Sequence, residues 1–242
     1  MEYKNLIIIG TSHIAKQSVQ EVKEAIEDNK PAIVAVELDP NRYYSLKSAK
    51  KTKIRLKDIF SLGIVGFIFA LLGRWAQKKL GKLVGVMPGT EMLTAIRAAQ
   101  KNNATIRLID QDIFITLKRL SKEITLKEKL RFFLDILKSI FFRKREMRRL
   151  GIENLDLTKV PSKEVVKKLT KEFRKSYPNA YKVLVTERNH VMAKRLARIM
   201  EESLGKKIVA VVGAGHEEEI VALVKSYEKK EKITYSFSLV TE

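Results

Sequence analysis

Two apolar runs near opposite ends of the chain each lead directly into a Gly-x-x-His step, and this pairing constrains the fold more than any other feature. The steps occupy residues 10–13 and 213–216 and end on His13 and His216. Continuous apolar runs are typical of buried parallel strands, and glycine permits a sharp turn into a helix. Open α/β folds bind ligands at the carboxyl edge of such a sheet. We therefore predict an α/β fold, with a central, mostly parallel sheet flanked by helices and both histidines at one edge.

A third strand exit adds a carboxylate to the two histidines. The apolar run that follows Pro31 ends on Glu37, and Pro40 marks its far boundary. The positive end of a helix favours the neutral imidazole, the form that binds metals. Two histidines and Glu37 from three strand ends form either an open metal site or, without metal, an acid–base site. Ordinary hydrogen-bonding and helix-capping roles are the structural alternative.

The remaining ionisable residues near these motifs receive simpler interpretations. Glu217, Glu218 and Glu219 follow His216 in the first turn of a predicted helix, where they compensate the helix dipole. Glu217 or Glu219 could also support the site behind its first ligands, but the sequence does not select one of the two. The chain has three histidines, and His190 falls inside a predicted helix, so we leave it outside the site.

The net charge of +20 is unevenly distributed along the chain. Residues 1–50 contain seven basic and seven acidic residues, and residues 201–242 contain six and eight, so residues 51–200 carry the whole excess. The predicted site residues thus lie in the two nearly neutral ends of the chain. This asymmetry predicts a single α/β domain over residues 1–242 with a basic helical insertion at roughly 54–88 and 122–178.

Two segments of the basic middle are also strongly apolar. Residues 59–73 form an almost uninterrupted apolar run, which Arg74 ends before the ~20 residues that a membrane span needs. Residues 126–150 form a predicted helix in which large apolar residues are mixed with nine basic ones. Helices of this type lie on anionic membrane surfaces. The alternative is that the two segments pack on each other or across a homodimer interface.

The rest of the pattern predicts alternating helices and strands. Helices are expected at residues 14–29, 42–50, 112–121, 164–176, 180–204 and 217–227, and strands at 104–109 and 207–212. The alternating polarity of residues 233–240 predicts a last strand, antiparallel at an edge of the sheet.

The composition and the missing motifs exclude several kinds of chemistry. The chain has no cysteine, which excludes thiolate catalysis, disulfides and cysteine-type zinc sites. It has no Gly-x-Ser-x-Gly, Walker or His-Glu-x-x-His motif. The charge attracts phosphate, but no base-reading motif supports specific nucleic-acid binding. The first five residues run directly into a core strand, so we expect a cytoplasmic protein without a signal peptide.

Taken together, these motifs resemble the TraB/PrgY/GumN family, which includes the Tiki proteins and is distantly similar to erythromycin esterases and ChaN-like proteins. The resemblance rests on the paired Gly-x-x-His steps, on the strand-end Glu37, and on further segments, namely Gly89-Thr90-Glu91-Met92, Leu108-Ile109-Asp110-Gln111-Asp112, Thr116-Leu117-Lys118-Arg119 and Glu187-Arg188-Asn189. Gln111 stands where the family usually has arginine. The likeness is strongest in residues 5–45, 88–120 and 185–220.

The resemblance implies a function and a set of site residues. Tiki proteins are described as metal-dependent peptidases that need both histidines and the strand-end glutamate, and TraB and PrgY proteins shut down peptide pheromone signals. The resemblance implies that His13, Glu37 and His216 are the catalytic and metal-binding residues. It further implies supporting roles, which fall on Glu91, Arg188 and Asn189. Many prokaryotic members continue into C-terminal transmembrane helices, so membrane association, as the soluble part of a longer protein, is also expected.

The sequence therefore predicts a metal-dependent hydrolase that acts on peptides, signalling peptides among them. His13 and His216 would hold a divalent Zn, Mn or Co ion, with Glu37 as a third ligand or as the base for its bound water. The basic middle would cover the site or dock the protein on a membrane or a partner. Two alternatives remain open: a protein that sequesters a peptide at the membrane surface without cleaving it, and a metal-free, esterase-like hydrolase.

Overall fold

A five-stranded sheet forms the centre of the computed structural model, which describes residues 1–11, 16–48, 58–84, 89–141 and 162–238. The strands are β1 (Glu2–Tyr3), β2 (Leu6–Thr11), β3 (Ile33–Val36), β4 (Thr105–Leu108) and β5 (Ile208–Gly213). Their order is β1-β2-β5-β3-β4, with β1 antiparallel to β2 and all other pairs parallel. The predicted α/β fold with a mostly parallel sheet is confirmed.

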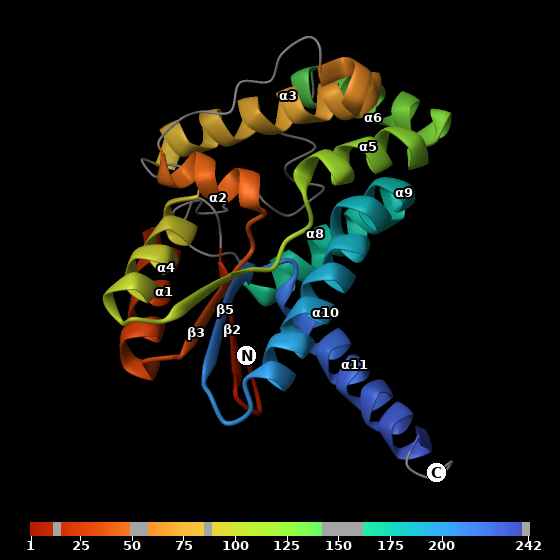
Figure 1. The fold of residues 1–242 in the computed structure, drawn as a ribbon. Coiled ribbons are helices and arrows are strands. Elements are labelled where there is room, and N and C mark those ends of the chain that lie inside the picture. Colours follow the sequence, from red (N-terminus) through yellow and green to blue (C-terminus); the bar gives the residue numbers. More distant parts are fainter. Residues whose placement is uncertain (12–15, 49–57, 85–88, 142–161, 239–242) are drawn as a thin grey trace.

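The described helices surround the sheet on both faces and at its carboxyl edge (Figure 1). They are α1 (Lys16–Asn29), α2 (Pro40–Lys47), α3 (Asp58–Val84), α4 (Thr90–Lys101), α5 (Ile113–Glu123), α6 (Leu126–Phe141), α8 (Lys163–Ser176), α9 (Pro178–Tyr181), α10 (Glu187–Glu202) and α11 (Glu217–Ser238), with a π-helical turn, η1 (Lys182–Thr186), between α9 and α10. Helices α3, α5 and α6 form a layer beyond the carboxyl ends of the strands, which we call the helical layer.

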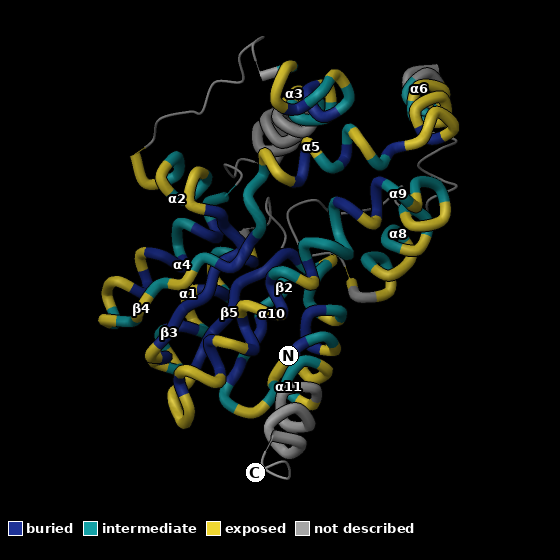
Figure 2. The backbone as a smooth tube through the Cα atoms, turned by 45° about the vertical axis from the view of Figure 1, so that its right-hand side comes forward, coloured by how far each residue is buried: buried dark blue, intermediate teal, exposed yellow. Residues whose placement is uncertain are grey.

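Alternate residues of the central strands bury into two separate cores. Ala210 and Val212 of β5 pack with α10 and α11, whereas Val209 and Val211 pack with α1 and α4. All six residues of β5 are buried because helices cover both of its faces (Figure 2). This burial explains why the strand appears in the sequence as a continuous apolar run rather than an alternating one.

The register of the parallel strands brings the predicted site residues to one edge. Gly10 pairs with Val212 and Thr11 with Gly213, so the two Gly-x-x-His steps leave neighbouring strands at the same level. On the other side of β5, Val36 pairs with Val211, which places Glu37 beside the second step. The three strand exits therefore meet, although His13 itself lies outside the described residues.

The predicted strand over residues 233–240 is wrong where the structure describes it, because α11 continues to Ser238. No glycine or proline interrupts the chain after Glu217, and each further residue is added easily to a helix once it is nucleated. The antiparallel edge strand is instead β1. The predicted helix over residues 180–204 is divided into α9, η1 and α10.

The two apolar segments of the basic middle are helical. Residues 59–73 lie within α3, and residues 126–141 form α6, while the rest of the second segment lies outside the described residues. Among the described helices, none combines the length and the apolar character needed to cross a bilayer.

Candidate functional site

Glu37 is a buried carboxylate at the end of β3, only 2% exposed. Its backbone N–H donates to the Val211 carbonyl at 3.0 Å, which extends the pairing of β3 with β5 by one residue. Its Oε2 accepts a hydrogen bond of 2.6 Å from the backbone N–H of Gly213. The glycine step after β5 thus binds one oxygen of Glu37 and leaves the other, Oε1, facing α10.

Arg188, in the first turn of α10, connects Glu37 with a second buried carboxylate. Its Nη2 donates to Glu37 Oε1, and its Nε and Nη2 donate to the two oxygens of Asp110 at 2.9 and 2.8 Å. Its Nη1 donates to the Leu184 carbonyl at 3.1 Å. Burial acts to lower the pKa of Arg188, but the charges and hydrogen bonds of the two carboxylates outweigh it and raise the pKa, so the guanidinium stays charged.

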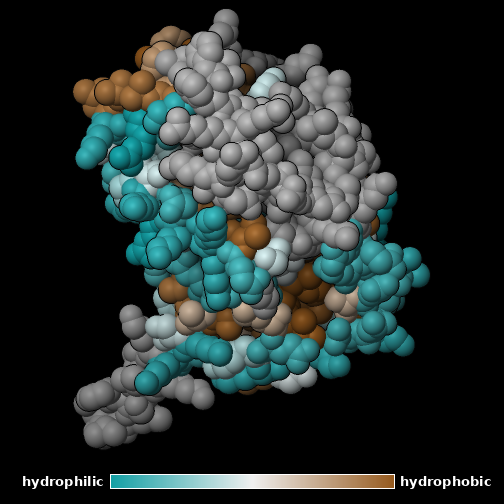
Figure 3. Space-filling model, turned by 180° about the vertical axis from the view of Figure 1, so that it is seen from behind, coloured by the Kyte–Doolittle hydropathy of each residue, from teal (hydrophilic) through white to brown (hydrophobic). Residues whose placement is uncertain are grey.

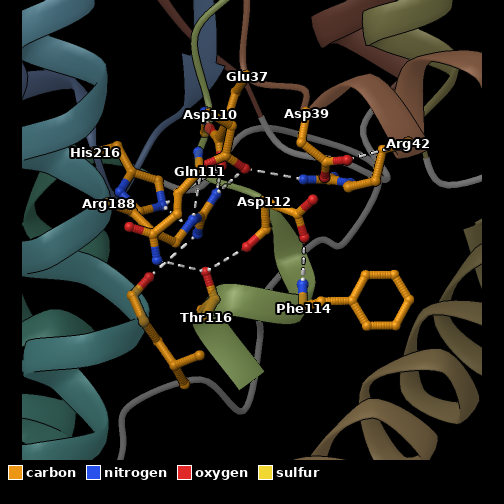
Figure 4. A network of polar contacts seen from close by, with 12 residues as sticks. Glu37, Asp39, Arg42, Asp110, Gln111, Asp112, Phe114, Thr116, Arg188 and His216 are labelled. Carbon is orange, nitrogen blue, oxygen red and sulfur yellow. Dashed lines mark hydrogen bonds and ion pairs between the residues drawn. The ribbon is translucent and has the colours of Figure 1, made fainter. Parts of the chain in front are cut away.

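Asp110 follows β4 and is held by more groups than Arg188 alone. Arg42 of α2 donates to its Oδ2 at 3.2 Å, and the Gln111 N–H donates to its Oδ1 at 2.8 Å. Arg195, two turns further along α10, donates to its carbonyl at 2.6 Å. Arg42 and Arg188 thus form ion pairs with the carboxylates of Glu37 and Asp110 in one compact cluster (Figure 4).

His216, directly before α11, receives a defined orientation from Asn189. Asn189 Nδ2 donates to Glu219 Oε2 at 2.8 Å, so the amide oxygen is turned toward His216. That oxygen lies 2.5 Å from His216 Nδ1. Because the amide oxygen can only accept, Nδ1 carries a proton, and in the neutral form of the ring Nε2 then keeps its lone pair. Asn189 is fully buried, which protects this arrangement from water.

The Nε2 atom of His216 faces the Glu37–Arg188 ion pair. It lies 3.7 Å from Glu37 Oε1 and 3.4 Å from Arg188 Nη1. Figure 4 shows the imidazole beside the guanidinium, with Asp110 close to both. A basic nitrogen and a carboxylate oxygen at this separation are able to share a bound cation or a water molecule.

The donor set around Glu37 and His216 suits a divalent ion, in that imidazole and carboxylate are ordinary ligands of Zn and Mn. Within the described ranges, no group of three or more histidine, aspartate or glutamate side chains could hold a metal. The third predicted ligand, His13, lies outside those ranges. Since Arg188 contacts the same oxygen of Glu37, an ion there would share this oxygen with the guanidinium.

Gly10 lies where the two Gly-x-x-His steps approach each other closely, and its own backbone is extended. It lies within the extended strand β2, and a Cβ atom there would come within 2.6 Å of Glu217 Oε2 and 3.2 Å of Ala214 Cα. The expected turn into a helix falls on residues 12–15, which lie outside the described residues. Glycine at this position lets the two Gly-x-x-His steps lie against each other.

Asp39, two residues after Glu37, combines capping with an unsatisfied oxygen. Its Oδ1 accepts from the Arg42 N–H at 3.0 Å and caps α2. Its Oδ2 is buried and has no hydrogen-bond partner in the described part of the chain. Burial raises the pKa of this carboxyl, against the opposing effect of Arg42.

The other predicted residues divide into those inside and those outside the contact network. Arg188 and Asn189 lie within it, and of the three acids after His216, Glu219 alone reaches Asn189. Glu217 instead accepts from the N-terminal amine at 3.1 Å, and Glu218 pairs with Lys167 at 3.0 Å. Glu91 is buried in the first turn of α4, and its supporting role stays a prediction. His190 is exposed and contacts Tyr227.

Asp110 and Arg42 were not predicted as site residues. Asp110 carries the same signal as Glu37, a carboxylate directly after an apolar strand, and this signal would have found it. Arg42 lies on α2, three residues after the Asp39 cap, and nothing in its sequence context distinguishes it from a surface arginine.

The fold and the site define an α/β protein with a buried polar centre at the carboxyl edge of its sheet. Residues 2–232 match the model of the TraB/PrgY/gumN family. The chain belongs to this family. It is 40% identical over 227 residues to the uncharacterized protein MJ1365 of Methanocaldococcus jannaschii, with 93% of this chain and 54% of the relative covered.

Eukaryotic relatives are more distant. TraB domain-containing proteins of Bos taurus and Homo sapiens are 24% and 23% identical, over 235 and 233 residues. The match covers 86% of this chain in both cases, and 59% and 60% of the relatives. The chain thus spans between half and two thirds of the length of these relatives.

Proposed function

We propose that the chain is a metal-dependent hydrolase of peptides, with His216, Glu37 and His13 at its reaction centre. The observation that carries the proposal is the orientation of His216. Its Nδ1 is bound by Asn189, and its unprotonated Nε2 faces the Glu37 carboxylate at 3.7 Å. Such a nitrogen accepts a proton from water or ligates a metal ion, and both are steps toward a nucleophile at neutral pH.

Arg188 has a positioning role in this proposal, because its hydrogen-bonding capacity is used within the protein. A guanidinium has five N–H donors. Those of Arg188 face Glu37, both oxygens of Asp110, the Leu184 carbonyl and His216. When His216 Nε2 ligates an ion, the one N–H of Arg188 that is released is the Nη1 group facing it, and the other four stay bound within the protein. Most of the positive charge for the oxyanion that develops when a carbonyl is attacked would therefore come from another group.

A divalent ion held by His13, Glu37 and His216 would supply that charge and lower the pKa of a bound water. The protein's own groups would then hold the ligands in place. Asn189 orients His216, and Arg188 with the Gly213 N–H orients Glu37. The resemblance to the Tiki proteins supports a peptide as the substrate class.

The test is peptide cleavage in the presence of Mn, Co or Zn, added singly and followed by mass spectrometry. We expect cleavage that needs one of these ions and is lost in His216→Ala. The matched control is His190→Ala, which removes an exposed histidine that lies on α10 and contacts Tyr227. Peptide binding without cleavage would contradict the proposal in favour of sequestration. Ester turnover that persists with a chelator would contradict it in favour of a metal-free esterase.

A further inference from the structure

Helix α6 presents one face to the protein, and specific contacts define that face. Glu128 is buried and accepts from the Asn179 N–H at 2.8 Å. Phe132 stacks on Phe69 of α3, with ring centroids 4.9 Å apart. Asp135 accepts a hydrogen bond of 2.6 Å from the Tyr177 hydroxyl. These three residues recur at helical spacing, so the opposite side of α6 points away from the protein.

The outward side of α6 is apolar. It consists of Leu126, Leu130, Phe133 and Leu134, which are 81%, 58%, 58% and 45% exposed. Their spacing of four, seven and eight residues from the first places them on one stripe of the helix. We call these four residues the α6 face. Large apolar side chains grouped in this way mark a surface that binds a partner or a lipid.

Exposed basic residues border the α6 face on both sides. At 100° per residue, Lys129 lies on one flank, and Lys127 and Lys138 lie on the other. An apolar stripe flanked by lysines is the pattern of helices that lie in the interface of an anionic membrane. Lysine stems can extend along an apolar surface while their ammonium groups reach lipid headgroups. Lys138 also pairs with Asp135 of the same helix at 3.5 Å.

Helix α3 extends the apolar surface within the helical layer. Phe60, Ile64, Ile68 and Leu71 are 94%, 69%, 45% and 43% exposed. Phe60 precedes a kink at Gly63, where the backbone is not helical, and the other three follow one stripe of the helix after it. Figure 3 shows hydrophobic side chains gathered at the upper left, where α6 and the start of α3 lie in this view, with hydrophilic ones directly below. The Phe69–Phe132 stack holds the two helices together.

We propose that the α6 face, together with the exposed stripe of α3, docks the protein on an anionic lipid membrane. Charge complementarity favours this occupant over a second copy of the chain. A net charge of +20 repels another copy, and the flanking lysines of two copies would meet across a symmetric interface. Nucleic acid would use the lysines but would leave the apolar stripe in water. An anionic bilayer uses both, and docking there places the helical layer between membrane and sheet.

The test is co-sedimentation of the full chain with vesicles of phosphatidylglycerol or phosphatidylcholine. We expect binding to phosphatidylglycerol that weakens with added salt, and little binding to phosphatidylcholine. The double variant Leu130→Glu/Phe133→Glu should bind phosphatidylglycerol at least about tenfold more weakly, because it loses two large apolar contacts and adds two negative charges. Both side chains are already exposed, so the fold should remain, as circular dichroism would verify.

The matched control is Leu204→Glu, which makes the same kind of change at a residue that is 83% exposed, in the loop between α10 and β5. This loop lies at the amino ends of the strands, away from the helical layer (Figure 1). Its vesicle binding should equal that of the wild type apart from the small effect of one added charge. The proposal is overturned if the wild type does not bind phosphatidylglycerol, or if both variants bind equally. A dimer that the double variant dissociates, without vesicle binding, would assign the face to a second copy instead.

Discussion

At the scale of single residues, the site is organised around a guanidinium that compensates two buried carboxylates. Glu37 and Asp110 are each 2% exposed, and Arg188 is 16% exposed. Like charges buried this close would repel strongly without a cation between them. Arg188 therefore allows Glu37 to remain at the edge of the sheet, where its second oxygen binds the Gly213 N–H.

Replacement of Arg188 should consequently be costly for stability. We expect Arg188→Gln to lower the free energy of unfolding by about 3–5 kcal/mol, because buried Glu37 loses the adjacent guanidinium and buried Asp110 loses one of its two arginine partners. Urea denaturation measures this loss. The control is Arg198→Gln on the same helix, where the guanidinium is 78% exposed and pairs with Glu202. It should cost about 0.5 kcal/mol or less. A similar small loss in both variants would show that Arg188 does not compensate the carboxylates.

The proton position on His216 is the second prediction at this scale. Glu219→Leu removes the acceptor that fixes the Asn189 amide, so the imidazole should become a mixture of its two neutral tautomers. One hydrogen bond is worth about 0.5–1.5 kcal/mol, which corresponds to a change in tautomer ratio of roughly two- to tenfold. Nitrogen-15 NMR of the ring measures it.

Two further variants distinguish this orientation from a general effect of mutation near the helix start. Glu219→Gln keeps an acceptor oxygen and should preserve the tautomer. Glu218→Leu changes a neighbouring acid that is 45% exposed and pairs with Lys167, and it should leave His216 unchanged. An Nε2-protonated ring in the wild type would contradict the assignment directly.

At the scale of elements, the strand exits were predictable and the helix details were not. The apolar runs before Gly10 and Gly213 and before Glu37 indicated three buried parallel strands, and the structure has β2, β5 and β3 there. The π turn η1 was not predicted, because nothing in the sequence of Lys182–Thr186 distinguishes a π turn from an α-helical one. In this turn the Glu187 N–H donates to the Lys182 carbonyl, five residues back, directly before Arg188.

The α6–α9 junction depends on one carboxylate that caps two helix ends. Glu128 Oε2 accepts from the Thr125 N–H at 3.1 Å, and Oε1 accepts from the Asn179 N–H at 2.8 Å. Burial acts to raise the pKa of Glu128, but hydrogen bonds from backbone N–H groups and from the Asn179 amide outweigh it and lower the pKa below its ordinary value. Because the folded-state pKa is depressed, the ionised carboxylate contributes stability above the ordinary value of 4.5 and loses it as the pH falls further.

Glu128→Gln should therefore destabilise the protein in a pH-dependent way. At pH near neutral we expect a loss of about 1–2 kcal/mol, since a charged cap is replaced by a neutral one. The difference should shrink as the pH falls below 4.5, where the wild-type side chain takes up its proton. Denaturation curves near neutral pH and below pH 4.5 measure the loss of unfolding free energy. The control is Glu201→Gln, a change at an exposed residue of α10. An equal loss at both pH values would show that the ionised form is not what caps the helices.

At the scale of the whole molecule, the fold brings together groups from both ends of the chain and from its middle. Parallel pairing of β2, β5 and β3 was foreseeable, because buried strands in α/β proteins align their carboxyl ends. The contact of Asp110 with Arg188 was not foreseen. Because β4 pairs with β3 in parallel, Asp110 leaves the sheet at the same edge as Glu37. The choice of Glu219 among three successive acids depends on the rotation of α11 against α10, which no local pattern encodes.

The most direct test of the account is peptide hydrolysis by Glu37→Gln compared with the wild type, with Mn, Co or Zn present. Glutamine keeps the size of the side chain but removes the negative charge with which Glu37 would bind a metal ion or accept a proton from water. The control is Glu217→Gln, a first-turn acid of α11 that accepts from the N-terminal amine. The account predicts that Glu37→Gln lowers turnover at least about a hundredfold while Glu217→Gln keeps it. Full turnover in a folded Glu37→Gln protein would contradict a reaction centre at Glu37 and His216.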